Sequence, residues 1–227
     1  DKFDFFINLI NKRLSNEPLQ IILESVPFYK YNFFTKKDVF IPRFETELCI
    51  DILKKYKRKF NSVLEVGCGL GCISITLALE GVSKDILAVD ISSKAITASI
   101  LNAERLDCNN VTFTNDNIFH IKHKKKYDLI VSNPPYIPAD QLKFLSKEIT
   151  DYEPISALNG GIDGLDLIKK VIYKSSKLLK NDGLLIIEIG YKQYLKVSRV
   201  LAQFNFREID KVYDYGDNVR CIISTRV

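Results

Sequence analysis

The stretch Ser62-Val-Leu-Glu-Val-Gly-Cys-Gly-Leu-Gly71 decides the fold of this chain. It joins an apolar run, which predicts a buried strand over residues 62–66, to three glycines at every second position. Residues 72–80 are mostly apolar, follow at once, and predict a helix. A strand that passes through a glycine-rich turn into a helix begins a βαβ unit. We therefore expect a parallel sheet with the glycine turn at the carboxyl end of its first strand.

The rest of the chain alternates apolar runs with helical patterns in the same way. The sequence predicts further strands at 85–90, 111–115, 127–132, 184–189, 207–212 and 219–225, and helices at 93–106 and 164–179. Turn residues at 215–218 indicate that the last two strands form an antiparallel hairpin. We predict an α/β fold with a doubly wound, seven-stranded, mostly parallel sheet of the Rossmann-like kind.

The residues before this sheet differ from the rest. They comprise an amphipathic start, an extended stretch at 21–41 and a predicted helix at 45–57. We divide the chain into an N-terminal segment at 1–40, with a short helical part and an extended or hairpin linker, and a main domain at 41–227. Because the first residue is Asp1 and not methionine, we expect the sequence to begin inside a longer product.

Composition excludes several classes of protein. The 227 residues are 46% apolar and 27% charged, enough to bury the core of one α/β domain and unlike a disordered or fibrous chain. No apolar run reaches the roughly 18 to 20 residues of a membrane span, so we expect a soluble protein. Five cysteines without a CxxC pair indicate reduced thiols and a cytoplasmic location. His120 and His123 have no third ligand nearby, so we predict no metal site.

The net charge of +5 is concentrated in two short basic runs, at Lys54–Lys59 and Lys122–Lys126. A solvated helix end and a surface loop explain them most simply, and a patch that binds a polyanion is the alternative.

The glycine turn indicates a ligand-binding loop. Its residues are Gly67, Cys68, Gly69, Leu70 and Gly71. The spacing is GxGxG, whereas the dinucleotide fingerprint is GxGxxG. Glu65, two residues before the first glycine, would repel a pyrophosphate but suits the ammonium group of a bound amino acid. A turn kept for packing alone is the alternative.

Two more strand ends carry acids. Asp90 ends the second strand, where a carboxylate can accept both hydroxyls of a ribose. Asp116 and Asn117 follow the third strand, where they can meet an adenine ring and its amino group. A helix N-terminal charge and a turn aspartate are the alternative explanations. Amino acid, ribose and base together predict S-adenosylmethionine as the cofactor.

The most informative motif follows the fourth strand: Asn133, Pro134, Pro135 and Tyr136. Prolines fix φ and donate no hydrogen bond, so their carbonyl groups stay free and rigid. With the Asn133 side-chain oxygen they can accept both hydrogens of a planar NH2 group, which Tyr136 would cover. A purely structural turn is the alternative. The motif predicts methyl transfer to an amide or aromatic amino nitrogen.

The chain resembles the release factor glutamine N5-methyltransferases of the HemK or PrmC type, which are class I methyltransferases. The resemblance runs over residues 17–227 and rests on NPPY together with these segments: Glu17-Pro-Leu-Gln20, Ile41-Pro-Arg-Phe-Glu-Thr-Glu47, Asp151-Tyr-Glu-Pro154, Gly160-Gly-Ile-Asp-Gly-Leu165, Glu188-Ile-Gly190 and Asp214-Tyr-Gly-Asp217. Phe44 stands where the family usually has proline, and Cys68 where it usually has threonine.

The resemblance implies a cofactor site, a substrate site and a protein partner. Gly67 through Gly71, Asp90, Asn117 and Asn133 would bind S-adenosylmethionine, and Arg43, Thr46 and Glu47 would shape its methionine end. Asn133 to Tyr136 would hold the glutamine of a Gly-Gly-Gln loop in a peptide chain release factor. The family also carries an N-terminal helical domain, of which only about 16 residues precede Glu17 here. We expect a monomer that binds neither membranes nor nucleic acid directly.

Two other functions remain open at this stage. The same NPPY turn and the lysine runs suit N-methylation of an exocyclic amino group in RNA or DNA, although such enzymes usually add a recognition domain or a basic groove. A catalytically silent, translation-associated binding protein is the other possibility. An inactive relative would be expected to lose the glycines, the ribose acid or Asn133, and all are present.

Overall fold

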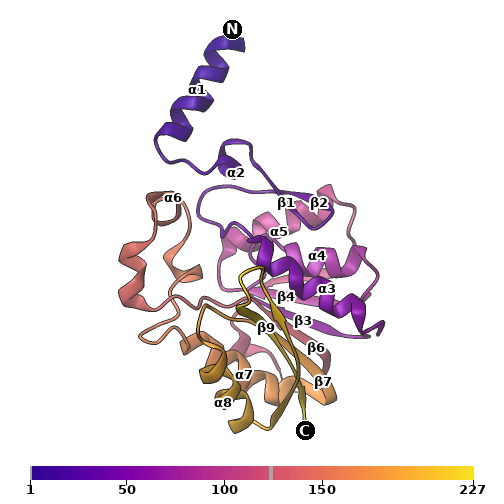
Figure 1. The fold of residues 1–227 in the computed structure, drawn as a ribbon. Helices are drawn as coiled ribbons and strands as arrows, with labels where there is room; N and C mark the ends of the chain where they lie inside the picture. The colour runs from indigo at the N-terminus through magenta and orange to yellow at the C-terminus, as the bar shows by residue number, and fades with distance from the viewer. Residues whose placement is uncertain (1, 123–124) are drawn as a thin grey trace.

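The computed structural model describes residues 2–122 and 125–227. A seven-stranded sheet in the order β5-β4-β3-β6-β7-β9-β8 forms the centre of this described part (Figure 1). Its strands are β3 (Val63–Val66), β4 (Ile86–Asp90), β5 (Val111–Asn115), β6 (Tyr127–Ser132), β7 (Leu179–Glu188), β8 (Phe206–Tyr213) and β9 (Val219–Arg226). The pairs from β5 to β7 are parallel and the last two are antiparallel. The predicted fold class and terminal hairpin are confirmed.

Helices cover both faces of the sheet because its central strands are apolar on both faces. Along β6, Leu129 and Val131 pack into one core while Ile130 packs into the other. The helices α3 (Leu48–Lys55), α4 (Cys72–Leu79) and α5 (Ser93–Arg105) lie on the first face. On the second face lie α7 (Asp166–Leu178) and α8 (Tyr194–Gln203) (Figure 1).

The N-terminal residues form α1 (Lys2–Leu14), α2 (Leu19–Ile22) and the antiparallel hairpin of β1 (Ser25–Phe28) and β2 (Tyr31–Phe34). Helix α1 buries none of its residues and extends away from the sheet (Figure 1). The hairpin packs into the core of the sheet, where the Phe28 and Phe33 rings meet edge to face at 6.0 Å. Much of the predicted extended stretch is thus this hairpin, and the division at residue 40 stays a prediction.

Three local expectations differ from the structure. The predicted helix at 45–57 starts as the 3-10 turn η1 (Phe44–Glu47) and ends with α3 at Lys55. Helix α8 was not predicted, although its buried Val197, Val200 and Leu201 have helical spacing. The connection at 133–164 contains η3 (Ala139–Phe144), α6 (Lys147–Thr150) and η4 (Ile155–Ala157), which are too short to show a period.

None of the helices in the described ranges combines the length and the apolar character that crossing a membrane requires.

Candidate active site

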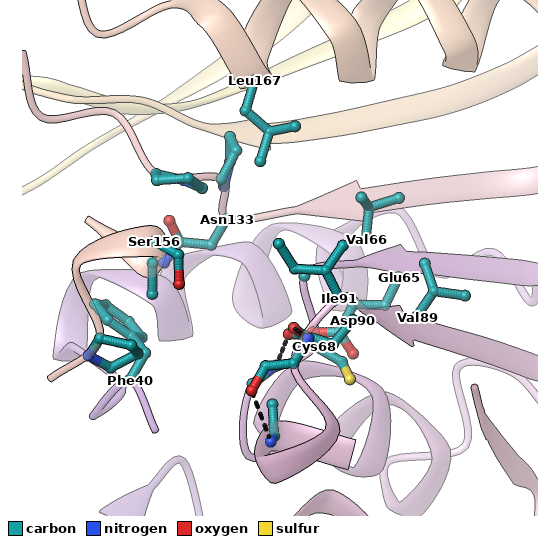
Figure 2. A pocket seen from close by; sticks show the side chains of 18 of the residues that line it. Phe40, Glu65, Val66, Cys68, Val89, Asp90, Ile91, Asn133, Ser156 and Leu167 are labelled. Carbon is teal, nitrogen blue, oxygen red and sulfur yellow. Dashed lines mark hydrogen bonds between the residues drawn. The ribbon is translucent and has the colours of Figure 1, made fainter. Parts of the chain in front are cut away.

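A pocket of about 430 Å³ lies at the carboxyl ends of β3, β4, β5 and β6. The order of the strands reverses between β3 and β6, and ligands of open α/β sheets bind at such a point. The predicted site residues that line it are Arg43, Thr46, Glu65, Gly67, Cys68, Gly69, Leu70, Asp90, Asp116, Asn117, Asn133, Pro134, Pro135 and Tyr136. Gly71 and Glu47 are not among the lining residues. Figure 2 shows Asn133 across the pocket from Glu65, Cys68 and Asp90.

The glycine loop packs against helices α4 and α5 on the side away from the pocket. Gly71 has φ of 80°, and a Cβ atom there would lie 3.0 Å from side-chain atoms of Ile75 and Ser99. Packing against α4 and α5 therefore requires a glycine at this position. Asn102, fully buried on α5, donates a hydrogen bond to the Leu70 carbonyl at 3.0 Å and another to the Phe34 carbonyl of β2 at 3.0 Å. One side chain thus joins the loop to the N-terminal hairpin.

Glu65 is a buried acid at the base of the pocket, with 1% of its surface exposed. Its Oε2 accepts a hydrogen bond from the Ser74 amide of α4 at 2.9 Å. Burial raises the pKa of the Glu65 carboxyl to about 8, even though the hydrogen bonds from Ser74 lower it. A cation beside this carboxyl would offset the cost of burying its charge.

Asp90 braces the loop and faces the pocket. Its Oδ2 accepts from the Gly69 amide and its Oδ1 from the Ser92 amide, both at 2.9 Å. Burial raises the pKa of Asp90, and the backbone hydrogen bonds oppose this rise. Each oxygen of a carboxylate has a second lone pair, so Asp90 can accept two further hydrogen bonds from a ligand.

Asp116 and Asn117 lie at the opening turn of η2 (Ile118–His120). The Asp116 Oδ1 accepts from the Asn117 amide at 2.7 Å and lies 2.7 Å from the His120 Nδ1. The Asn117 amide and then His120 lower the pKa of Asp116. The Asn117 Oδ1 accepts from the Phe119 amide at 3.0 Å, so this side chain caps η2.

Two lining residues beside these acids were not predicted. Ile91, which directly follows Asp90, is 64% exposed, and Phe119 is 42% exposed. These two apolar side chains, which lie close to Asp90 and Asp116 in the sequence, can cover the face of an aromatic ring in the pocket. The signal was visible in the sequence, because Ile91 interrupts a polar stretch between Asp90 and Ser92.

The NPPY turn presents Asn133 to the pocket. The Asn133 Nδ2 donates to the Thr46 Oγ1 at 3.1 Å, and Thr46 in turn donates to the Glu188 Oε2 at 2.8 Å. No described residue donates to the Asn133 Oδ1. Burial, followed by the Glu188 charge, raises the pKa of Tyr136.

A second set of contacts holds the backbone of the turn. The Gln193 Nε2 donates to the Tyr136 carbonyl at 2.9 Å and to the Gly164 carbonyl at 3.3 Å, while its Oε1 accepts from the Gly190 amide at 2.8 Å. A Cβ atom on Gly164 would lie 2.3 Å from the Tyr136 carbonyl oxygen, so this close approach requires glycine. The Tyr136 carbonyl is therefore engaged by Gln193.

Arg43 acts from the rim of the pocket. It forms an ion pair with the buried Glu153 at 2.6 Å, donates to the Ile41 carbonyl at 2.7 Å, and stacks over the Phe40 ring at 4.8 Å. These contacts tie residues 40–43 to the segment around Glu153, and both segments line the pocket.

The comparisons with known proteins agree with this geometry. The profile of the Methyltransferase small domain family matches residues 31–149. The release factor glutamine methyltransferase of Buchnera aphidicola is 34% identical over 226 residues, which cover 99% of this chain and 81% of that protein. The chain belongs to the release factor glutamine methyltransferases. The member from Fusobacterium nucleatum is 39% identical over 96% of this chain and 62% of its own length.

The fold is also that of other methyltransferases. The crystal structure of a ribosomal protein L11 methylase from Lactobacillus delbrueckii subsp. bulgaricus matches with a TM-score of 0.62 and 22% identity, over 89% of this chain and 90% of that chain. As a release factor glutamine methyltransferase, the chain is an S-adenosylmethionine-dependent enzyme. The predicted family, activity and cofactor are confirmed.

The ion pairs that the described lysines of the two basic runs form lie away from the pocket of this methyltransferase. Lys54 forms an ion pair with Glu80. Lys125 forms an ion pair at 3.1 Å with Asp85, the residue immediately before β4. Lys126 immediately precedes β6. Both sites are at the amino ends of the strands, opposite the pocket, while His123 and Lys124 fall outside the described residues.

No group of three or more metal-ligating side chains occurs within residues 2–122 and 125–227. All five cysteines are buried and free.

Proposed function

We propose that this chain transfers the methyl group of S-adenosylmethionine to the side-chain amide nitrogen of the glutamine in a Gly-Gly-Gln loop of a peptide chain release factor. The observation that carries the proposal is Asn133, which lines the same pocket as the glycine loop with its Oδ1 available for a ligand. Family membership supports a release factor as the protein substrate.

The cofactor fits the residues of the pocket. The Glu65 carboxylate would bind the ammonium group of the cofactor, because a nearby cation stabilises the ionised form of this buried acid. Asp90 would accept from the ribose hydroxyls through the lone pairs that Gly69 and Ser92 leave free. Ile91 and Phe119 would cover the adenine ring beside Asp116 and Asn117. When bound, S-adenosylmethionine supplies a methyl group on a positively charged sulfur.

The NPPY turn would activate the substrate by position. An amide nitrogen is a poor nucleophile because its lone pair is delocalised. The Asn133 Oδ1 and a carbonyl of the proline turn would accept its two protons, orient the nitrogen, and stabilise the positive charge that develops on it. The turn needs no movement to do so, because prolines fix its φ angles and Gln193 holds its far end. The extra proton can leave to water after transfer, so no general base is required.

A direct test is incubation of the enzyme with labelled cofactor and a purified release factor. We expect one methyl group on the glutamine of the Gly-Gly-Gln loop, located by mass spectrometry. A release factor with alanine in place of that glutamine is the control. Label that persists on the alanine variant contradicts the proposal.

No observation favours nucleic acid as the substrate. Lys54, Lys125 and Lys126 lie near the amino ends of the strands, opposite the pocket. Replacing Lys54, Lys55 and Lys57 by glutamine should leave methylation of the release factor within about twofold of wild type, because exposed surface charges contribute little.

A further inference from the structure

A chain of hydrogen bonds runs from the protein interior to the Asn133 side chain. It begins at Glu188, the last residue of β7, which is 1% exposed, and passes through Thr46 of η1, which is 3% exposed. Thr46 donates to the Glu188 Oε2 at 2.8 Å, and Asn133 donates to the Thr46 Oγ1 at 3.1 Å. Three segments that are far apart in the sequence are thus joined by one line of hydrogen bonds, from Glu188 through Thr46 to Asn133.

The chemistry of the three groups fixes the direction of this line. An ionised carboxylate only accepts, so the single hydroxyl proton of Thr46 is committed to Glu188. The Thr46 oxygen can then only accept from its other neighbour. Asn133 must therefore turn its NH2 group toward Thr46 and its oxygen toward the pocket. The two ends of a carboxamide have nearly the same shape, so packing alone would not decide between them.

The backbone of the NPPY turn does not depend on this line. Gln193 bonds the Tyr136 carbonyl at 2.9 Å, and Gly164 packs against the same atom. A change at Thr46 is therefore expected to release one side-chain orientation while the turn stays in place.

We propose that Thr46 and Glu188 are positioning residues, which lock the Asn133 carboxamide with its oxygen facing the substrate and thereby make the site select glutamine over glutamate. The inference rests on the proposed function. A glutamine amide offers hydrogens to the Asn133 Oδ1, whereas an ionised glutamate side chain offers none. If Asn133 turned over, its NH2 group would face the pocket and favour the carboxylate.

The test compares Thr46→Val with Thr46→Ser. The valine side chain has nearly the same shape without the hydroxyl, and serine restores the hydroxyl. We expect Thr46→Val to lower kcat/KM on the release factor roughly 10-fold or more, since one oriented acceptor is lost, and to change the affinity for S-adenosylmethionine by less than about threefold. Thr46→Ser should stay within about fivefold of wild type. Glu188→Gln, which can donate to Thr46 and so reverse the line, should behave like Thr46→Val.

The matched control is Thr35→Val. Thr35 is fully buried, its Oγ1 has no hydrogen-bond partner among residues 2–122 and 125–227, and it does not line the pocket. The same substitution there should leave kcat/KM within about twofold of wild type, because no hydrogen bond is lost.

Two readouts separate orientation from general structural damage. The first is the affinity for release factors with Gly-Gly-Gln or Gly-Gly-Glu, measured by calorimetry. Wild type should bind the Gly-Gly-Gln form more tightly, and the ratio of the two affinities should be at least about threefold smaller in Thr46→Val. The second is hydrogen exchange of the Asn133 side-chain NH2 by ¹⁵N NMR, which should be slow in wild type and Thr46→Ser and fast in Thr46→Val.

The outcomes distinguish this inference from the proposed function. If wild type methylates the release factor and Thr46→Val matches it in preference and exchange, the positioning role is wrong and the proposed function stands. If wild type does not methylate the release factor, the proposed function fails, and selection of glutamine fails with it. Should Thr46→Val not fold, Glu188→Gln and the exchange of the wild-type NH2 group decide the question.

Discussion

The two sides of the pocket are built in different ways. The glycine-loop side comes mainly from the ends of two neighbouring strands, where the Gly69 and Ser92 amides donate to Asp90 at 2.9 Å. The NPPY side depends on partners from distant segments, because Asn133 reaches Thr46 and Tyr136 reaches Gln193. Residues of one βαβ unit therefore supply most of the cofactor loop, with Asn102 holding it from α5, whereas orienting the substrate's amide depends on residues from distant segments. If this division is correct, mutations on the two sides should affect different kinetic constants.

The largest effect is expected from Asn133→Ala. It removes the side-chain acceptor on the NPPY side and leaves the glycine-loop side unchanged. We expect transfer to slow by roughly 100-fold or more, since one preorganised polar contact contributes about 3 to 4 kcal/mol to the transition state. Calorimetry should show a change in cofactor affinity of less than about threefold, far smaller than the loss of rate. A matching loss of cofactor affinity would mean that the two sides are not separable.

Asp90→Asn tests the opposite side. It keeps one acceptor for the backbone amides but removes the charge and one acceptor from the ligand. We expect cofactor affinity to fall about 10- to 50-fold, since hydrogen bonds to charged groups contribute about 1.5 to 3 kcal/mol. The rate at saturating cofactor should stay within about threefold of wild type. A large fall in that rate with unchanged affinity would contradict the division.

The pH profile of kcat sharpens the comparison on the NPPY side. Burial raises the pKa of Glu188 to about 7, although Thr46 and Arg220 lower it. The other titratable groups that face it are Glu45 on η1, Tyr136 on the NPPY turn and Cys221 on β9. Below pH 7 a protonated Glu188 can donate to Thr46, which frees Asn133 to turn over.

We therefore expect kcat at saturating cofactor to fall several-fold between about pH 8 and pH 6, following the ionised fraction of a group that titrates near pH 7. Glu188→Gln should show a low and flat profile over this range. A wild-type profile that is also flat would remove Glu188 from the orientation of Asn133.

The smallest effect concerns the stability of the glycine-loop side. Burial raises the pKa of Glu65 to about 8, above its ordinary value of 4.5. Between these values the unfolded chain loses a proton that the folded protein retains, so stability falls as the pH rises from 4.5 to 8. Glu65→Gln should reduce this fall and raise Tm at pH 8 by at least about 2 °C relative to wild type. Scanning calorimetry at pH 5 and pH 8 measures it, and an equal fall in both proteins would contradict it.

Most of the fold and one side of the site were predictable from the sequence. The central strands of the sheet follow from continuous apolar runs, and the residues of the glycine loop follow from their spacing after the first of these strands. Helix α8 was missed even though Val197, Val200 and Leu201 carry a helical period. The Thr46–Glu188 contact was not predictable, because it joins residues 142 positions apart. Arg43 was expected at the methionine end of the pocket, and its ion pair with Glu153 emerged only from the packing of two loops.

Asn102 has a consequence for how this protein can be shortened or grafted. Its side chain donates hydrogen bonds to both β2 and the glycine loop. The hairpin at 25–34 and the cofactor pocket are therefore held by the same buried side chain. Trimming the chain before Ser25 leaves both contacts of Asn102 in place, whereas trimming through Phe34 removes its partner on β2. The smallest fragment that keeps both contacts of Asn102 therefore includes residues 25–34.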